Sequence, residues 1–377
     1  MKGHIRERGK NWVVVVDLGK DSTGKRRQHW ETVKGAKRDA QRRLREILTT
    51  VESGAYVKPS HLTLGEWLQE WLSGYVATNC APRTQASYAE LVRLHIAPAL
   101  GQTPLPQLDP QQIQAFYAAK TGEGKVRTAR YCHSLLRQAL GHAMKQGIVG
   151  RNAALMCDPP RVERKTMTTL AAADIPQFLE AVSRTPHYAL FVTLLASGMR
   201  RGEVLALKWK NLDLTKGYAF VVESGFKVNG QWSTKDPKTA SGRRRVALPI
   251  SLVAVLQEHR CKETANREDL GGRLTDEDYV FTRFGGEPLD PTTVSHALAD
   301  AVDKAGLPHL RLHDLRHSYA TLLLKAGQHP SVVAVQLGHS SVRTTLDVYS
   351  HVLPGLQEAA ARSMEGFMPK KLSEGNL

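Results

Sequence analysis

The 377-residue sequence predicts a multidomain protein with three folded parts in series. We expect a small three-stranded β-sheet with one helix, then an all-helical bundle, then a larger, mainly helical (α+β) domain. Apolar residues alternate with a period of two near the N-terminus, and helical spacing replaces that alternation further along. A stretch rich in proline and charge then separates the bundle from the rest of the chain. The length also exceeds what one compact core usually holds.

The first part, residues 1–57, carries the strand signals. Short alternating runs at 4–8, 12–18 and 26–32 are separated by turns that contain glycine, which is typical of an antiparallel sheet. Residues 36–51 then show helical spacing of apolar side chains, with arginines elsewhere on the helix surface. We therefore expect one helix to follow the sheet.

The second part, residues 61–157, shows only helical patterns. It opens with Thr63 and Glu66, the T-x-x-E pattern of a capping box, ahead of a helix that buries tryptophan and leucine. Pro159 and Pro160, with the charged residues after them, indicate a linker. Further helices are expected at 87–96, from Asp109 and Pro110 onward, and at 126–146.

The third part, residues 166–365, mixes helices with a few strands, and a polar tail follows at 366–377. An apolar helix is expected at 188–197, and Gly198 is suited to end it because a left-handed residue commonly closes a helix. Strands are expected at 218–223, 244–248 and 279–282.

Net charge indicates the kind of partner. Lys and Arg number 52 against 36 Asp and Glu, a formal charge of +16. Residues 1–50 hold 14 basic and 6 acidic side chains, so this segment supplies 8 of the 16 excess charges. Such a balance favours a polyanionic partner, either nucleic acid or an anionic membrane surface. No apolar run approaches the roughly 20 residues of a membrane span, and no signal peptide is evident, so a cytoplasmic location is expected.

The four cysteines are widely spaced and form no C-x-x-C pair, which argues against a disulfide framework or a zinc knuckle. We expect reduced, mostly buried thiols. The segment from Gly19 to Arg26 approximates a phosphate-binding loop. Arg26 stands where such a loop needs Ser or Thr, and strand signals follow where a helix would be required, so a charged hairpin loop is the better interpretation.

Residues 313–349 concentrate polar groups that carry chemistry. His313 and Arg316 lie three positions apart and share one face of an expected helix, so both can converge on one ligand. Gly338 ends a later helix and places His339 at a turn. His313 and His317 also imitate a zinc-binding pair, but the fixed charge of Arg316 and the lack of a third ligand argue against a metal.

These segments resemble the signature of the tyrosine recombinase, or phage integrase, family. Residues 196–203 resemble that family's first arginine box, with Arg200 at the catalytic position and Glu203 at the supporting acidic position. The second box is matched in order and approximate spacing by His313, Arg316, His339 and Tyr349.

The resemblance extends to a lysine and to all three parts. Residues 237–239 resemble the β-hairpin that carries the family's catalytic lysine, which implies Lys238 for that role, with Lys235 and Lys227 nearby. The first part is similar to arm-type DNA-binding domains of mobile-element integrases, the second to the helical core-binding domain, and the third to the catalytic domain.

The chemistry explains why these residue types are needed. The forks of Arg200 and Arg316 can grip phosphate oxygens and stay charged at any working pH. His313 and His339 would add hydrogen bonds, and His313 could accept the proton of Tyr349. The hydroxyl of Tyr349, with an ordinary pKa near 10, needs such neighbours to become a nucleophile.

The family implies a 3′-phosphotyrosyl intermediate that requires neither metal nor cofactor. It also implies a homotetramer on double-stranded DNA with core and arm-type sites, accessory DNA-bending or directionality factors, and a nucleoid-associated location. Two alternatives stay open: a type IB topoisomerase, which rejoins the original strand, and a transcription regulator that binds DNA without chemistry. The N-terminal module argues against the first, and Tyr349 downstream of two arginine boxes argues against the second.

Overall fold

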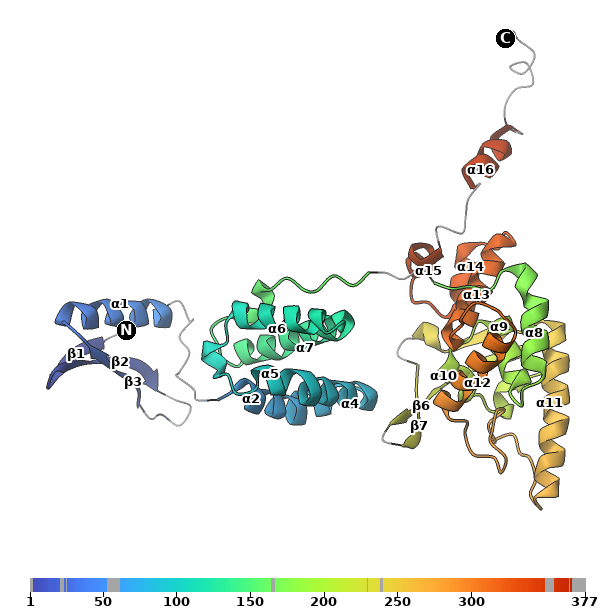
Figure 1. Cartoon of the computed structure of the whole chain (residues 1–377), viewed down its shortest axis with the longest axis horizontal. Helices are drawn as coiled ribbons and strands as arrows, with labels where there is room; N and C mark the ends of the chain where they lie inside the picture. The colour runs from blue at the N-terminus through green and yellow to red at the C-terminus, as the bar shows by residue number, and fades with distance from the viewer. Residues whose placement is uncertain are drawn as a thin grey trace, which may run out of the picture. The chain divides into compact units, whose positions relative to one another are not determined.

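Figure 1 shows the computed structural model of the chain. It describes residues 3–20, 24, 26–52, 62–163, 167–228, 230–237, 240–349, 356–365 and 367. The chain divides into two compact units, Met1–Arg164 and Lys165–Leu377. Apolar side chains gather in separate cores within these units.

An antiparallel sheet of order β1-β2-β3 opens the first unit. Its strands are β1 (Gly3–Arg8), β2 (Asn11–Lys20) and β3 (Arg26–Lys34), and helix α1 (Lys37–Glu52) follows. Val14 and Val16 of β2 form a small core with Ala40 and Ile47 of α1, because alternate residues of a strand share one face. The sheet and the helix are confirmed. Strands stand on either side of the suspected phosphate-binding loop, whose residues 21–23 and 25 lie outside the described part.

The helical bundle of the first unit follows capping signals in the sequence. Thr63 and Glu66 form a reciprocal capping box at the start of α2, and Asp109 and Gln112 form another at the start of α6. Trp67 is buried and donates its indole N–H to the carbonyl of Ala139, 3.1 Å away. The bundle comprises α2 (Leu64–Trp71), α3 (Ala77–Asn79), α4 (Pro82–Leu91), α5 (Ala97–Leu100), α6 (Pro110–Gly122) and α7 (Val126–Lys145), with π-helical turns at Leu72–Val76 and Val92–Ile96.

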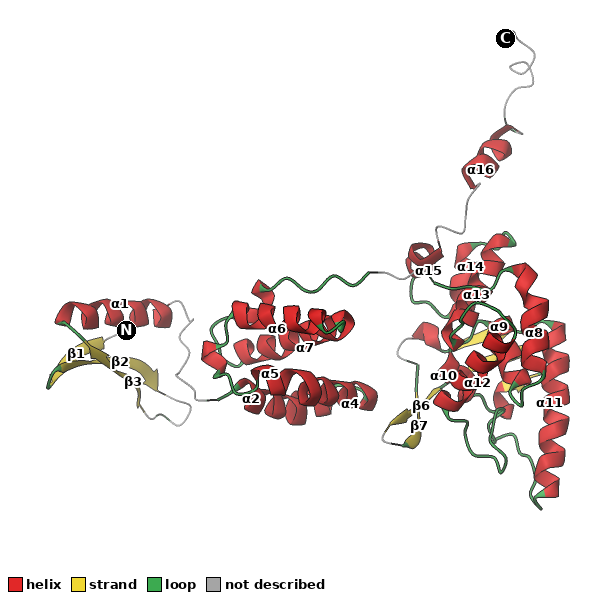
Figure 2. Ribbon diagram, viewed as in Figure 1, coloured by secondary structure: helices red, strands yellow, loops and turns green. Residues whose placement is uncertain are grey.

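Helices make up most of the second unit, and short strands lie among them (Figure 2). The helices are α8 (Ile175–Ser183), α9 (Tyr188–Ser197), α10 (Arg201–Leu205), α11 (Ile250–Asp269), α12 (Pro291–Lys304), α13 (Leu312–Lys325), α14 (Pro330–Leu337), α15 (Val342–Tyr349) and α16 (Leu356–Glu365). Strands β4 (Leu212–Asp213), β5 (Tyr218–Val221) and β8 (Arg244–Ala247) form one sheet in that order. A separate hairpin pairs β6 (Ser224–Val228) with β7 (Gln231–Lys235). The expected combination of sheet module, helical bundle and mainly helical domain is confirmed.

Helix α9 is the central element for the site. It is buried almost all round, and it ends at Gly198, whose φ of +65° is the left-handed conformation that glycine adopts easily. Helix α13 packs against it. Helix α14 ends in the same way at Gly338, with φ of +66°. Carbonyls at the C-terminal ends of α9 and α14 accept hydrogen bonds from Arg316.

Some expectations need correction. Residues 279–282 do not form a strand, because Tyr279 and Thr282 make only isolated bridges to Lys208 and Pro288. The expected helix at 87–96 begins earlier, at Pro82. Cys132 and Cys157 are buried and Cys80 is half-buried, but Cys261 is exposed on α11. Among the described helices, none combines the length and apolar character that crossing a bilayer requires.

Candidate active site

Arg200 caps the N-terminus of α10, immediately after the turn that ends α9. Its backbone N–H donates to Glu203 Oε2 over 2.9 Å, and its Nη1 donates to Glu203 Oε1 over 2.8 Å. A second guanidinium nitrogen, Nη2, donates to the carbonyl of Gly338, 3.2 Å away. The side chain is still 41% exposed, so it is fixed in direction but open to a ligand.

Glu203 is shared between two arginines. Its side chain is 4% exposed, and Oε2 also accepts a 2.8 Å hydrogen bond from Arg244 Nη2. Burial alone raises the pKa of Glu203, but the bonds and charges of Arg244 and Arg200 outweigh burial and hold the pKa below its usual value. The carboxylate therefore stays ionised and partly neutralises two cations.

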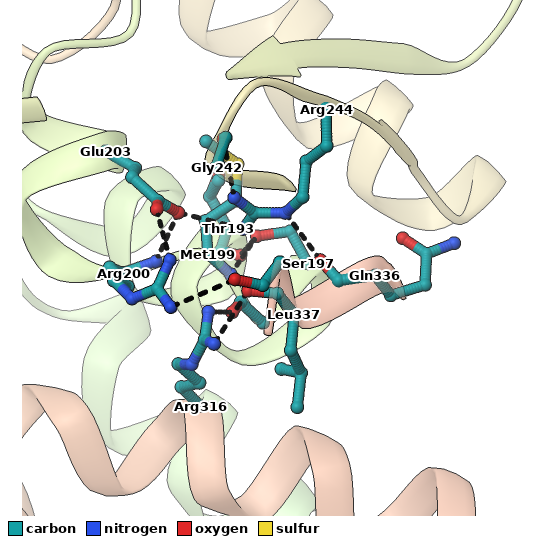
Figure 3. A network of polar contacts seen from close by, with 12 residues as sticks. Thr193, Ser197, Met199, Arg200, Glu203, Gly242, Arg244, Arg316, Gln336 and Leu337 are labelled. Atoms are coloured by element: carbon teal, nitrogen blue, oxygen red, sulfur yellow. Dashed lines mark hydrogen bonds and ion pairs between the residues drawn. The ribbon is translucent and has the colours of Figure 1, made fainter. Parts of the chain in front are cut away.

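Arg316 lies on α13 and is 2% exposed. Its Nη1 donates to the carbonyl of Gly198 and its Nη2 to the carbonyl of Leu337, both over 2.7 Å. These carbonyls belong to the C-terminal ends of α9 and α14, where the helix dipole favours a positive charge. Figure 3 shows Arg200, Arg244 and Arg316 converging on this region, and with Glu203 we call them the arginine frame.

The two predicted histidines lie close to the arginine frame. Partial desolvation, then His317 and the charge of Arg316, lower the pKa of His313 to about 4, although the residue is exposed at the surface. His339 follows Gly338, and desolvation with the charges of Arg316 and Arg200 lowers its pKa to about 4 as well. Both rings are therefore neutral at pH 7, which suits hydrogen bonding and proton acceptance.

His339 is tied to the helix that ends at Tyr349. Its Nδ1 is 2.8 Å from the hydroxyl of Thr345, which is fully buried on α15. Thr345 and Tyr349 are four residues apart and so share one face of the helix. The structure places Tyr349 as the last residue of α15, and its side chain lies outside the described part.

The candidate lysine region lies beside the same site. A pocket of about 380 Å³ is lined by Arg200 and His339 and also by Lys235 and Pro237. Lys238, next in the chain after Pro237, falls outside the described residues, so its predicted role stays a prediction. Lys235 ends β7 with its ammonium 5.2 Å from the ring centre of Phe226. Lys227 is paired with Asp290 at 2.6 Å.

Chemically, the arrangement can hold a phosphodiester and stabilise the charge that builds on its oxygens during attack. Fixed guanidiniums, neutral imidazoles and a nearby helix that ends in tyrosine form one constellation. Over the described stretch of chain, no three His, Cys, Asp or Glu side chains gather as metal ligands would. The two histidines that imitate a zinc-binding pair, His313 and His317, pack edge to face with ring centres 4.7 Å apart.

Sequence reasoning missed Arg244 and Thr345. Arg244 stands in a run of three arginines, and nothing in the run marks the middle one as buried. Glu203 gives only a weak signal in the sequence, because a carboxylate that becomes buried needs a cationic partner, but its position does not show which arginines supply it. The main-chain acceptors for Arg316 could not be read from side-chain identities.

The comparisons with known proteins identify the family of the chain. Residues 168–355 match the phage integrase family, and residues 63–120 match the N-terminal SAM-like domain of phage integrases. An integrase of Streptomyces ambofaciens is 28% identical over 375 residues, which covers 97% of this chain and 96% of the relative. A XerC-like tyrosine recombinase of Caldanaerobacter subterraneus is 27% identical, covering 93% and 95%.

Solved structures show the same fold. The Tn1549 transposon integrase in complex with a circular intermediate DNA has a TM-score of 0.69 at 20% identity, covering 81% of this chain and 100% of that chain. A lambda integrase tetramer bound to a Holliday junction has a TM-score of 0.56 at 22% identity, covering 89% and 95%. The fold and the site define the class as tyrosine recombinases, enzymes that break and rejoin DNA. Within that class, the chain belongs to the phage integrase family.

Proposed function

We propose that this enzyme is a site-specific DNA recombinase that integrates and excises a mobile genetic element, with Tyr349 as the nucleophile. The observation that carries the proposal is the arginine frame beside two neutral histidines, with Thr345 joining His339 to the helix that ends at Tyr349. A regulator that only binds DNA needs positive charge at its surface. It does not need buried guanidiniums held in fixed directions.

Each residue then has a role. Arg200 and Arg316 hold the non-bridging oxygens of the scissile phosphate, and Glu203 keeps Arg200 in place. His313 accepts the proton of Tyr349 as its oxygen attacks phosphorus, and His339 donates a hydrogen bond to the phosphate. The phosphorus–O5′ bond breaks, which leaves a 3′-phosphotyrosyl link and a 5′-hydroxyl. That link conserves the bond energy for rejoining, so metal and nucleotide are not required.

The leaving oxygen needs a proton, and we assign this task to Lys238. An arginine does not readily give up a proton, whereas a lysine whose pKa is lowered by neighbouring cations can do so. Lys235 is the alternative, because it lines the same pocket as Arg200 and His339.

The division of labour follows the three parts of the chain. We assign arm-type DNA to residues 1–57, core DNA to 61–157, and catalysis to 166–365. Support for the second assignment comes from α7, whose 20 residues include no Asp or Glu. Arg130, Arg137 and Lys145 line one shallow groove along it. These cations span about 22 Å of helix, a length suited to following a DNA backbone.

Assembly is proposed from the relatives. The lambda integrase neighbour is a tetramer on a Holliday junction. We infer that four copies of this chain act on two DNA sites and exchange strands in pairs, and that accessory DNA-bending or directionality factors assist. Such an enzyme would work on the chromosome, in the cytoplasm and associated with the nucleoid.

Replacing Tyr349 with Phe tests the central proposal. Incubation with nicked suicide DNA, followed by denaturing electrophoresis, should show a covalent complex for the unaltered chain and none for Tyr349→Phe. DNA affinity should hardly change, because one hydroxyl contributes little to a large charged interface.

Tyr319→Phe is the matched control. Tyr319 lies on α13 near the site, but burial raises the pKa of its hydroxyl, so it is a poor nucleophile. This variant should still become attached to DNA. Attachment of the Tyr349→Phe protein would disprove the assignment of the nucleophile.

A further inference from the structure

Arg244 is a nearly buried cation of the arginine frame to which the family resemblance assigns no role. Its side chain is 5% exposed and reaches three acceptors. Nη2 donates to Glu203 and Nε donates to the carbonyl of Gln336, both over 2.8 Å, and Nη1 donates to the carbonyl of Gly242 over 3.3 Å. Arg244 is not among the described residues that line the pocket. The guanidinium therefore faces protein rather than DNA.

The first consequence concerns Arg200. One oxygen of Glu203 accepts from Arg244 and from the backbone of Arg200, and the other accepts from the guanidinium of Arg200. Gripped from both sides, the carboxylate cannot rotate without breaking a charge-assisted hydrogen bond. The direction of the Arg200 fork is thus set through Glu203 by Arg244.

The second consequence concerns His339. Arg244 holds the last turn of α14 through Gln336, and it packs against Gly338, where an added Cβ would lie 2.8 Å from Nη1. Gly338 in turn accepts from Arg200 and precedes His339 in the chain. The same guanidinium also holds Gly242, at the far end of the segment that carries Lys238. One side chain therefore connects three of the segments that bear candidate catalytic groups.

We propose that Arg244 is a positioning residue for strand cleavage, which sets the direction of Arg200 through Glu203 and fixes the turn before His339. The proposal rests on the function proposed above. It requires that Arg244 affect the rate of cleavage more than the affinity for DNA, and that its effect depend on Arg200.

Arg244→Lys is the informative substitution. Lysine keeps the charge beside Glu203 but cannot bind three acceptors with a planar fork. A misplacement of about 1 Å can cost a reaction on the order of 100-fold, so we expect single-turnover cleavage to slow by about that factor while DNA affinity stays within about twofold. Arg245→Lys is the matched control, because Arg245 is the next residue of β8 and lies against the ring of Tyr218, 4.3 Å away. It should leave the rate unchanged.

A double-mutant cycle separates positioning from general loss of structure. The Arg244→Lys change is repeated in the Arg200→Lys background, with 5′-bridging sulfur DNA to keep slow variants measurable. If Arg244 acts through Arg200, the Arg244→Lys change should slow cleavage by much less than about 100-fold in the Arg200→Lys background. The same factor in both backgrounds would overturn the proposal, as would an unchanged rate for Arg244→Lys alone.

Folding and the enzymatic function are checked separately. Thermal unfolding of each variant reports its fold, and Arg244→Gln replaces the lysine variant in the same cycle if the latter does not fold. Absence of cleavage by the unaltered chain would count against the proposed function. If the unaltered chain cleaves DNA and the Arg244 variant cleaves it at the same rate, only the positioning role of Arg244 is refuted.

Discussion

His313 and His339 lie among fixed cations, and this has a measurable consequence. Their pKa values of about 4 in the free protein lie below the ordinary 6.5. As the pH falls from 6.5 towards 4, the unfolded chain binds these protons more tightly than the folded chain, so the folded state loses stability. A bound phosphate reverses the local balance, because its negative charge favours the protonated rings and raises both pKa values.

We therefore predict that DNA binding takes up protons at a pH of about 5, and that affinity for core DNA increases as the pH falls through the raised pKa values. Calorimetric titrations in two buffers with different ionisation enthalpies measure the uptake. The His339→Gln variant should take up fewer protons than the unaltered chain. Equal uptake by both proteins would show that His339 does not meet the phosphate.

Lys238 can be tested by changing the leaving group. Sulfur at the 5′-bridging position leaves without a proton, so a general acid becomes unnecessary. We predict that Lys238→Ala slows cleavage of ordinary DNA strongly and slows cleavage of sulfur DNA much less. An equal defect on both substrates would remove Lys238 from this role.

Two neighbouring lysines complete the comparison. Lys235→Ala repeats the test for the alternative candidate. Lys227→Ala is the control, because Lys227 is paired with Asp290 at 2.6 Å and should show no dependence on the leaving group. The variant whose defect shrinks on sulfur DNA identifies the acid.

At the scale of elements, the left-handed glycines at helix ends differ in what surrounds them. Gly327, after α13, has φ of +80° with nothing within 4 Å of an added Cβ, whereas a Cβ at Gly338 would meet Arg244 at 2.8 Å. In both alanine variants the left-handed backbone costs roughly 1–2 kcal/mol. Gly338→Ala must also displace Arg244, so it should be more destabilising by about 1–3 kcal/mol.

Urea denaturation of the two variants measures this difference, and suicide-DNA cleavage shows its effect on the site. We predict that Gly338→Ala slows cleavage and Gly327→Ala does not. Equal midpoints and equal rates would mean that the turn before His339 tolerates a shift of Arg244.

Elements with strong local signals were predictable from the sequence. The capping residues Thr63 and Asp109 and the end of α9 at Gly198 all rest on interactions within a few residues. The resemblance placed a hairpin at 237–239, whereas the hairpin that the structure describes pairs β6 with β7 before that point. Its strands were not predicted, because their pairing depends on contacts across the strands rather than on a regular apolar alternation.

The same division holds for the site. Arg200, His313, Arg316 and His339 were predicted as site residues from motif, spacing and family resemblance, and the structure brings these four side chains together. The link between Arg244 and Glu203 joins residues 41 positions apart, which no local pattern reveals. Likewise, Arg316 donates to main-chain carbonyls, so the sequence predicts the arginine but not its hydrogen-bond acceptors.

At the scale of the molecule, charge is concentrated at the N-terminal end. Residues 1–55 contain the sheet, on which Arg6 lies over the exposed ring of Trp30 at 5.7 Å. We predict that removing these residues abolishes binding to arm-type DNA and leaves weak cleavage at the crossover site. The slope of log affinity against log salt should fall by about 0.9 for every DNA phosphate that the shortened chain no longer neutralises.

The comparison uses two DNAs. On DNA that includes arm-type sites, the truncated chain should show a smaller slope than the whole chain, and on core DNA alone the two should agree. The same slope for both chains on arm-containing DNA would refute an arm-binding role for the sheet.

The main-chain acceptors of Arg316 also affect how many amino-acid substitutions the site can tolerate. The carbonyls of Gly198 and Leu337 belong to the backbone, so a change of side chain at Leu337 cannot delete the acceptor there. Only a change that moves the helix end can do so. Side chains around the two helix ends can therefore be substituted extensively while Arg316 keeps its orientation. This agrees with relatives that are only 27% and 28% identical to this chain.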